Sequence, residues 1–327
     1  MLNPLWTSLI LGAWTKHGKL MKDHRGETDP NEASDSFWRE ESDVVAPAIR
    51  EKQERKRLMS DEVRSHDHDT RTILTERRGS TLLVTINRPE VKNALDAPTA
   101  SALAQAFREF DRNEELAVAV LNGSGGTFCS GFDLKAVADE TRMPQVSEEG
   151  DGPLGVTRML LSKPVIAAIE GYAVAGGLEV ALWCDLRVAA DNAIFGVLNR
   201  RWGVPLVDGG TIRLPRLIGQ SHALDLILTG RSVSGPEALT MGLVNRLSRP
   251  GESLVTALAL ASDLARFPQR GLRSDRLSVY EQWSLSWEEA LGNETRRGLS
   301  VLRSGESVEG AQRFAAGHGR HGSTSDI

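Results

Sequence analysis

The sequence predicts an α/β fold in which helices cover a mostly parallel sheet. Between residues 71 and 209, short apolar segments typical of buried strands alternate with segments of helical periodicity. Beyond Gly209 the sequence has helical character almost to its end. The chain has 327 residues, of which 40% are hydrophobic and 25% charged, and this is enough apolar sequence for a sizeable core.

The expected strands are short runs of apolar residues that end at turn signals. The first strand is followed by Asn87-Arg88-Pro89, and the second by Gly123-Ser124-Gly125-Gly126. The expected strands cover residues 81–86, 117–121, 164–169, 186–190 and 193–195.

The expected helices follow from capping residues and from apolar periodicity. Asp96 precedes Ala97-Pro98, the order of an N-cap and a first-turn proline, and helical periodicity then continues over residues 98–112. Later helices are expected over residues 220–229, 252–266 and 284–297.

The composition divides the chain into three regions. Residues 1–70 are predicted to be a charged, disordered extension, because residues 15–70 carry dense mixed charge and little apolar periodicity. Residues 71–265 form the predicted core domain, and residues 266–327 form a C-terminal helical region. The His66-Asp67-His68-Asp69 cluster is expected to be solvated, and no metal site is assigned to the chain.

The charge and cysteine content limit the class of protein. A net charge of −5 argues against a nucleic-acid or anionic-membrane surface as the main partner. The apolar run over residues 1–14 is too short to span a bilayer, and its cations follow it, whereas a secretory signal has them first. Cys129 and Cys184 are the only cysteines and offer no disulfide framework, which favours a cytoplasmic protein.

The most informative motif runs from Gly171 to Glu179 and joins a strand to a helix. Its adjacent glycines, Gly176 and Gly177, allow a ligand to approach bare backbone, and the helix N-terminus offers unpaired N–H groups. Such donors stabilise a developing oxyanion. Glu179, one turn along, would face the same ligand. The motif indicates an enzyme that polarises a carbonyl group and moves a proton beside it.

A second turn, Ser130-Gly131-Phe132-Asp133, follows a strand and would present the N–H of Phe132 to the ligand. Asp133 would brace this turn or cap the next helix. Backbone donors from Phe132 and Gly176 together would make an oxyanion hole.

Asp208 has two interpretations. It is either the N-cap of a helix that begins near Gly210 or a catalytic carboxylate. No Gly-x-Ser-x-Gly elbow or Gly-Lys-Ser/Thr phosphate loop is present, and Cys129 is expected to be a packing residue.

Taken together, these motifs resemble the crotonase superfamily, the enoyl-CoA hydratase/isomerase fold. The resemblance covers about residues 71–320 and rests on blocks in the family's order. The blocks are Asn87 to Pro89, Asn93 to Leu95, Phe128 to Leu134, Lys163 to Gly171, Gly176 to Glu179, Cys184-Asp185, Ala193 to Gly196, Arg216 to Gly219, Leu228 to Gly230, Ala238-Leu239 and Gly242 to Asn245. The resemblance implies a spiral of ββα units with mostly parallel sheets and a C-terminal helical trimerisation region.

The resemblance implies an acyl-CoA thioester substrate and no separate cofactor, because coenzyme A is part of the substrate. The thioester oxygen would be held by the N–H groups of Phe132 and Gly176, and Glu179 would be one of two catalytic glutamates. The implied substrate and CoA contacts are Arg88, Val91, Asn93, Ala94, Ser130, Asp133, Leu134, Lys135 and Gly177. The implied assembly is a homotrimer or a dimer of trimers, with neither nucleic acid nor stable membrane association.

The sequence departs from the hydratase pattern at the second glutamate, which falls on Asn199. Asparagine can orient a water molecule but cannot take or give its proton. Asp208 could compensate, because its loop resembles the one from which dienoyl-CoA isomerases and naphthoate-synthase relatives project a catalytic aspartate. The expected function is hydration of a trans-2-enoyl-CoA. An enoyl-CoA or dienoyl-CoA isomerase that uses Glu179 and Asp208 as a proton shuttle, and a catalytically weak acyl-CoA-binding protein, remain alternatives.

Overall fold

A computed structural model describes residues 71–139 and 141–319 of the chain. The chain divides into two units after Asp69, and all described residues belong to the second unit, Thr70–Ile327. The predicted extension over residues 1–70, with its histidine and aspartate cluster, lies outside the described residues. Within the described ranges, no three metal-binding side chains gather into a cluster. The helices in the same ranges include none that is long and apolar enough to cross a membrane.

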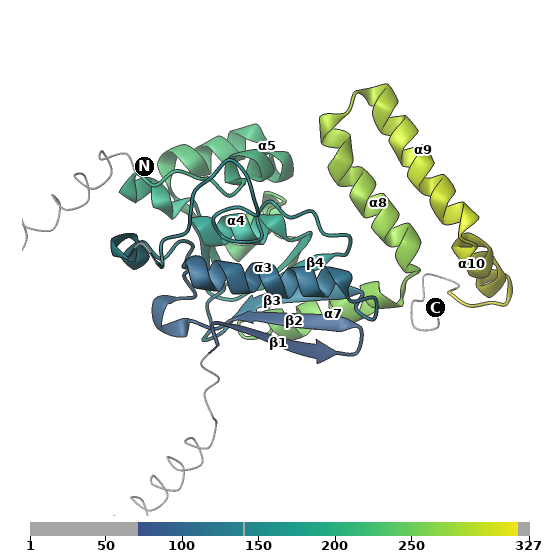
Figure 1. Ribbon diagram of the computed structural model, residues 1–327, viewed down its shortest axis with the longest axis horizontal. Coiled ribbons are helices and arrows are strands. Elements are labelled where there is room, and N and C mark those ends of the chain that lie inside the picture. Colours follow the sequence, from purple (N-terminus) through teal and green to yellow (C-terminus); the bar gives the residue numbers. More distant parts are fainter. Residues whose placement is uncertain (1–70, 140, 320–327) are drawn as a thin grey trace, which may run out of the picture. The chain divides into compact units, whose positions relative to one another are not determined.

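A six-stranded sheet forms the centre of the core (Figure 1), with the strand order β1-β2-β3-β4-β6-β9. β1 and β2 form an antiparallel hairpin, and every later pair in this order is parallel. The strands of this sheet are β1 (Ile73–Arg78), β2 (Thr81–Ile86), β3 (Val118–Gly123), β4 (Val165–Ile169), β6 (Leu186–Ala190) and β9 (Arg246–Ser248). A second sheet joins β5 (Tyr172–Val174), β7 (Ile194–Gly196) and β8 (Ser232–Ser234).

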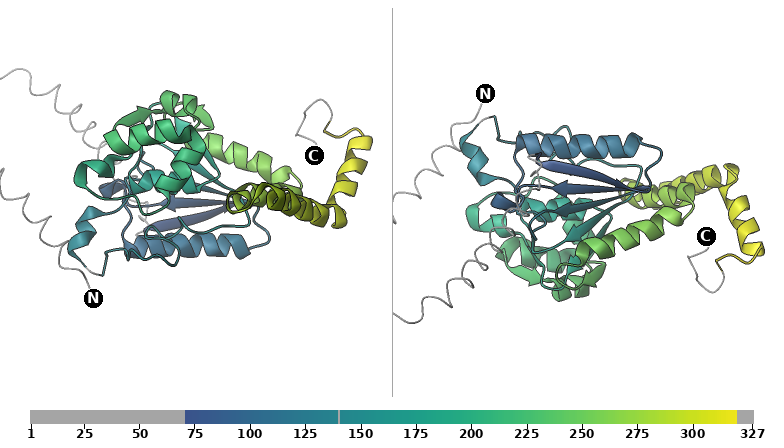
Figure 2. Two further views of the ribbon diagram at one scale, coloured as in Figure 1. Left: turned by 90° about the horizontal axis from the view of Figure 1, so that it is seen from above. Right: turned by 90° about the horizontal axis from the view of Figure 1, so that it is seen from below.

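Helices pack on both faces of the large sheet, because the side chains of a strand alternate between its two faces. The buried cluster that holds Val84 includes residues of α3 (Ala97–Arg112). The cluster that holds its neighbour Leu83 includes residues of α7 (Ser253–Arg266). Figure 2 shows α3 and α7 on opposite sides of the strands.

Further helices follow the strands and build the surroundings of the predicted site. They are α4 (Gly176–Trp183), α5 (Gly210–Thr229) and α6 (Gly235–Thr240), together with the 3-10 helices η1 (Pro89–Val91), η2 (Leu134–Ala138) and η3 (Leu198–Trp202).

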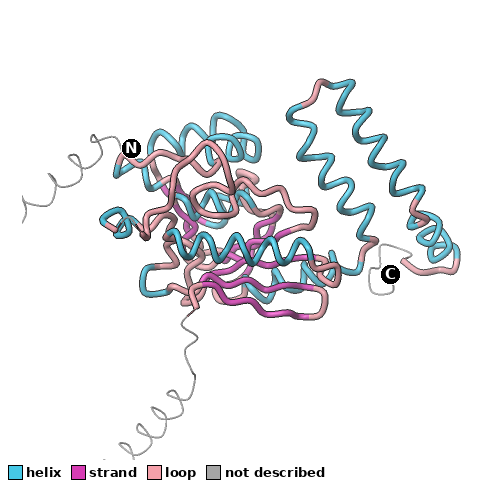
Figure 3. Tube along the Cα trace, in the orientation of Figure 1, coloured by secondary structure: helices cyan, strands magenta, loops and turns pink. Residues whose placement is uncertain are grey.

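The C-terminal region consists of α8 (Gln269–Glu281), η4 (Gln282–Ser284), α9 (Trp287–Arg303) and α10 (Glu306–Ala315). Figure 3 shows α9 running back alongside α8. The carboxylate of Asp185 ties α8 to the core, because it accepts hydrogen bonds from Arg276 and Tyr280, each at 2.7 Å. No residue of α8, α9 or α10 is buried, and Trp287 is 76% exposed. Such an apolar surface is typical of an interface.

The predicted α/β class, the parallel strands and the capped helix are confirmed. Asp96 accepts a hydrogen bond from the N–H of Thr99 at 3.1 Å and so caps α3. β1, β5, β8 and β9 were not predicted. β1 is exposed over its last four residues, so it lacks the alternation that marks a half-buried strand.

Two helix predictions were too narrow or shifted. The helix expected to begin near Gly210 and the segment expected over residues 220–229 form one helix, α5, in which Pro215 and a kink at Gly219 interrupt the periodic pattern. α9 begins at Trp287 rather than at residue 284, because Ser286 starts a capping box.

Candidate active site

A strained backbone turn orients the amide of Gly176. Ala175 has φ 53° and ψ −127°, a positive φ that residues with a side chain rarely adopt. Its N–H donates to the carbonyl of Gly196 on β7 at 2.9 Å, and its carbonyl accepts from Leu178 and Glu179. These bonds hold the turn, and the N–H of Gly176, the first residue of α4, stays outside the hydrogen bonds of the helix.

The amide of Phe132 lies next to that of Gly176. Leu95 and Phe132 form an isolated parallel bridge, in which Leu95 donates to the carbonyl of Gly131 at 2.7 Å and Asp133 donates to the carbonyl of Leu95 at 2.9 Å. This bridge uses one side of the segment and leaves the N–H of Phe132 on the other side. A Cβ on Gly131 would lie 2.7 Å from the amide nitrogen of Gly176, so the two segments are in close contact.

The two N–H groups converge on one place. A Cβ on Gly176 would lie 3.5 Å from the nitrogen of Phe132. Within residues 71–139 and 141–319, neither N–H donates a hydrogen bond. Two neighbouring backbone donors without partners can hold a single oxygen and stabilise negative charge on it.

Glu179 is a buried carboxyl group that the loop before α5 holds in place. It is 3% exposed, and its Oε1 accepts hydrogen bonds from the N–H groups of Asp208 at 2.9 Å and Gly210 at 2.8 Å. Its Oε2 receives no hydrogen bond from the described residues. Burial raises the pKa of Glu179 to about 7, although the hydrogen bond from Gly210 opposes the shift. The group can therefore take or release a proton near neutral pH.

The raised pKa of Glu179 predicts a measurable effect on stability. The folded state binds the proton more tightly than the unfolded chain, so folding stability is expected to fall as the pH rises from about 4.5 to about 7. Glu179→Gln removes this dependence. We expect the variant to be more stable than the wild type by about 3 kcal/mol above pH 7 and equally stable near pH 4. Urea unfolding at both pH values measures the difference, and equal stabilities at pH 8 would contradict it.

Asp208 is a second buried carboxyl group in the same loop. It is 3% exposed, and its Oδ1 accepts hydrogen bonds from the N–H of Leu154 at 3.1 Å and from the hydroxyl of Thr157. Burial raises the pKa of this carboxyl, despite the opposing hydrogen bond from Thr157. The N-cap of α5 is Gly209, and no side chain caps that helix, so the helix-cap interpretation of Asp208 is wrong.

Both carboxyl groups are linked to the surroundings of Gly176. The backbone of Asp208 binds Glu179, while its side chain binds the segment that contains Leu154. A Cβ on Gly176 would lie 2.7 Å from Cδ1 of Leu154. Arg213 supports the loop, because it donates to the carbonyls of Asp208 and Thr157. The loop before α5 thus joins two carboxyl groups with raised pKa values.

Asn199 is buried on η3 and contributes an acceptor. It is 8% exposed, and its Nδ2 donates to the carbonyl of Val204 at 2.8 Å. Its Oδ1 is buried and has no partner among the described residues. Among those residues, no hydrogen bond joins it to Glu179 or Asp208.

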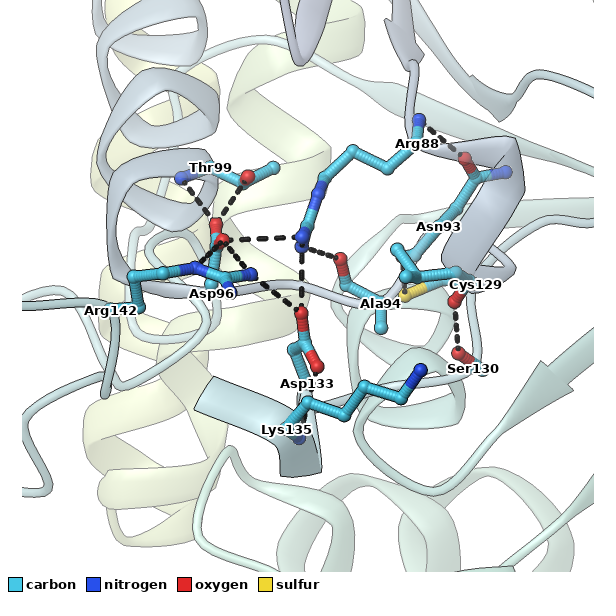
Figure 4. A network of polar contacts seen from close by, with 11 residues as sticks. Arg88, Asn93, Ala94, Asp96, Thr99, Cys129, Ser130, Asp133, Lys135 and Arg142 are labelled. Carbon is cyan, nitrogen blue, oxygen red and sulfur yellow. Dashed lines mark hydrogen bonds and ion pairs between the residues drawn. The ribbon is translucent and has the colours of Figure 1, made fainter. Parts of the chain in front are cut away.

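The predicted CoA contacts fall into a buried group and an accessible group. Arg88, Asn93 and Asp133 are buried, and their side chains are used internally, as Figure 4 shows for the guanidinium of Arg88 between two carboxylates. The polar side chains of these three residues are thus engaged within the protein. Ala94 and Gly177 are buried too, whereas Val91, Ser130, Leu134 and Lys135 are partly or largely exposed.

Sequence reasoning missed Leu154, Thr157 and Arg213, which hold Asp208. Leu154 and Thr157 lie more than fifty positions before Asp208 in a glycine- and proline-containing loop without a chemical motif. Cys129 is fully buried and its pKa is raised to about 12 by burial, in keeping with a packing role.

Comparisons with known proteins agree on one family. The family model described as enoyl-CoA hydratase/isomerase matches residues 76–317. An enoyl-CoA hydratase of Mycobacterium tuberculosis is 36% identical over 246 residues, which cover 74% of this chain and 92% of that protein. A carnitinyl-CoA dehydratase of Salmonella enteritidis is 37% identical over 246 residues, covering 73% of this chain and 93% of that protein. The crystal structure of an enoyl-CoA hydratase from Mycobacterium marinum has a TM-score of 0.71 and 38% identity, and the match covers 75% of this chain and 96% of that one.

Proposed function

Because this chain belongs to the enoyl-CoA hydratase/isomerase family, we propose that it adds water to the double bond of a trans-2-enoyl-CoA. One observation carries the proposal. The unpartnered N–H groups of Phe132 and Gly176 converge beside Glu179, a buried carboxyl with a pKa of about 7. An enolate oxygen needs such donors, and proton transfer at neutral pH needs such a group.

In the proposed reaction, the thioester oxygen accepts hydrogen bonds from both amides. Ionised Glu179 removes a proton from water, and the water oxygen bonds to Cβ of the substrate. The electron pair of the double bond moves to the thioester oxygen and gives an enolate, which Phe132 and Gly176 stabilise. Protonated Asp208 then gives its proton to Cα. These steps leave Glu179 protonated and Asp208 ionised, and transfer of one proton from Glu179 to Asp208 restores both groups for the next turnover.

The CoA moiety is proposed to lie along the accessible residues Val91, Ser130, Leu134 and Lys135, with the backbone of Arg88 to Ala94 beside it. No separate cofactor is needed for this chemistry. Residues 71–265 would form the acyl-CoA domain and residues 266–327 the region that assembles a homotrimer or a dimer of trimers. The exposed apolar side chains of α8 to α10 support that assembly. Reduced, buried Cys129 and Cys184 support a cytoplasmic location.

Asn199 favours a second candidate, an enoyl-CoA or dienoyl-CoA isomerase. Moving a double bond requires only that one proton leaves one carbon and another reaches a different carbon. Glu179 and Asp208 suffice for that shuttle, and Asn199 cannot exchange a proton. The two candidates differ in their products, because hydration adds one water to crotonyl-CoA and isomerisation leaves the mass unchanged.

The test is an assay with purified protein and crotonyl-CoA. Hydration is expected to remove the absorbance of the conjugated thioester and to add one water to its mass. If crotonyl-CoA is bound but unchanged while a 3-enoyl-CoA gains conjugated absorbance, the isomerase replaces the hydratase. Saturable binding without either reaction would leave the binding-only alternative.

Asp208→Asn tests the second proton donor. The amide oxygen can still accept hydrogen bonds from Leu154 and Thr157, so the loop should remain, whereas the proton donor is lost. We expect kcat to fall by about 10²-fold with little change in thermal stability. Thr157→Val is the matched control, because it removes the brace and keeps the carboxyl group. If Thr157→Val lowers kcat as much as Asp208→Asn does, Asp208 acts only as a brace.

A further inference from the structure

Four charged side chains, those of Arg88, Asp96, Asp133 and Arg142, form a cluster (Figure 4), which we call the charge cluster. Oδ2 of Asp96 lies 3.2 Å from Nη2 of Arg88 and 2.9 Å from Nη2 of Arg142. Oδ2 of Asp133 lies 3.0 Å from the same nitrogen of each arginine. Each carboxylate therefore bridges both guanidinium groups, and the four formal charges sum to zero.

The charge cluster is attached directly to the bridge that orients Phe132. Asp133 follows Phe132 in the chain, and Asp96 follows Leu95, the other residue of the bridge. The hydrogen bonds of the bridge run from Leu95 to Gly131 and from Asp133 to Leu95. Asp96 and Asp133 are thus the chain neighbours of Leu95 and Phe132, the two bridge residues whose backbone sets the direction of the Phe132 N–H.

Burial differs sharply between the four members. Arg88, Asp96 and Asp133 are 8%, 5% and 4% exposed, whereas the side chain of Arg142 is 38% exposed. The three buried charges alone sum to −1. Burial opposes ionisation of Asp96, but hydrogen bonds from Thr99 and Arg142 outweigh it and lower the pKa of this carboxyl. Arg142 is therefore the residue that neutralises the buried charge.

Arg142 belongs to a segment outside the predicted motifs. It follows η2, and its carbonyl accepts a hydrogen bond from the N–H of Ala97 at 2.9 Å, at the start of α3. Its guanidinium reaches both carboxylates from the solvent side. Neither the motifs nor the family resemblance assigned a role to this residue.

On the basis of the proposed function, we propose that Arg142 is a positioning residue for the oxyanion hole, which it serves by neutralising the charge cluster attached to the Leu95–Phe132 bridge. Without it, a net negative charge remains beside the place where the enolate oxygen develops. Repulsion between like charges is strongest in the transition state and weak for the neutral thioester. Loss of Arg142 should therefore lower kcat and leave KM nearly unchanged.

The experiment compares variants that change the net charge in opposite directions. Arg142→Met leaves the charge cluster with a net charge of −1 and is expected to lower kcat about tenfold. This loss is smaller than the 10²–10³-fold loss that removal of an oxyanion donor causes. Asp96→Asn leaves the charge cluster with a net charge of +1 and keeps an acceptor oxygen for the cap of α3, so the variant is expected to retain kcat. The double variant is neutral again and should recover most of the activity. Arg142→Lys keeps the charge and should lie within about twofold of the wild type.

A spectroscopic readout separates this proposal from the proposed function. A cinnamoyl-CoA chromophore absorbs at longer wavelength when hydrogen bonds polarise its thioester carbonyl, and binding requires no turnover. We expect the shift to be smaller in Arg142→Met than in the wild type and to recover in the double variant. An unchanged kcat and shift in Arg142→Met overturn the proposal. The proposal is also overturned if Asp96→Asn and Arg142→Lys lower kcat as much as Arg142→Met does, because such losses indicate lost structure rather than lost charge.

If the wild type fails to hydrate crotonyl-CoA, the proposed function fails, and the chromophore shift still decides the role of Arg142. Thermal unfolding and CoA binding of each variant provide the check on folding. Arg142 is the most exposed member of the cluster, so its replacement is expected to leave the fold intact.

Discussion

Glu179→Gln is expected to lower kcat for hydration by about 10²–10⁴-fold while the affinity for acyl-CoA stays within about twofold. Glutamine cannot accept a proton from water, but its carbonyl oxygen can still accept the N–H groups of Asp208 and Gly210. The loop before α5 should therefore keep its position. Steady-state kinetics with crotonyl-CoA and binding of a saturated acyl-CoA measure the two effects separately.

Glu170→Gln is the matched control for this prediction. The carboxylate of Glu170 also accepts two backbone N–H groups, from Gly251 at 3.0 Å and Ser253 at 2.9 Å, and it has no assigned role in the reaction. It should retain wild-type kcat. If Glu179→Gln turned over at the rate of this control, Glu179 would have no part in proton transfer.

Gly131→Ala is expected to lower kcat by about 10²–10³-fold, the cost of an impaired oxyanion hole. Gly131 has φ 98°, and a Cβ there would lie 2.7 Å from the nitrogen of Gly176. The methyl group would push the two amides apart and fill the space of the oxyanion. KM should change much less than kcat, because the neutral thioester depends less on these donors.

Gly126→Ala separates the oxyanion effect from backbone strain. Gly126 also has a positive φ, 74°, but nothing lies within 4 Å of a Cβ there. Both substitutions should lower the stability of the protein by about 1–2 kcal/mol, because alanine is strained in the left-handed conformation. Only Gly131→Ala should also lower kcat. Equal kcat values for the two variants, measured well below both melting temperatures, would rule out the steric argument.

The sequence predicted those parts of the candidate site whose chemistry is local. Gly176 and Glu179 lie in one helical turn, and Gly131 before Phe132 marks a turn that exposes backbone. The capped start of α3 was predictable for the same reason, because Asp96 and its partner Thr99 are three residues apart. In each case the residues that make the feature lie in one short segment of the chain.

Features that depend on distant contacts could not be predicted. The partners of Asp208 come from a loop more than fifty residues earlier, so its cap interpretation could be rejected only from the fold. Arg88 matched a CoA-binding block, but no sequence pattern reveals that its guanidinium is buried between two carboxylates. Arg142 joins them from a segment without any motif, which is why its role emerges only from tertiary contacts.

Asn199 was identified from the sequence, but its hydrogen bonds could not be predicted. The residue type establishes that no proton can be exchanged there, but not which of its amide atoms is available. The fold uses Nδ2 to bind Val204 and leaves the buried Oδ1 without a partner among the described residues. The atom of Asn199 without a partner is thus a hydrogen-bond acceptor, and it could accept a hydrogen bond from water or from a hydroxyl group.

Exchange of the Cα hydrogen of butyryl-CoA in D₂O is the most direct test of the central claim, that Phe132 and Gly176 stabilise a thioester enolate. The substrate has no double bond, so exchange reports enolate formation alone and holds for a hydratase or an isomerase. We expect the wild type to incorporate deuterium at Cα and Gly131→Ala to do so at least about 10²-fold more slowly. Binding of butyryl-CoA without exchange, or equal rates in the two proteins, would contradict the account.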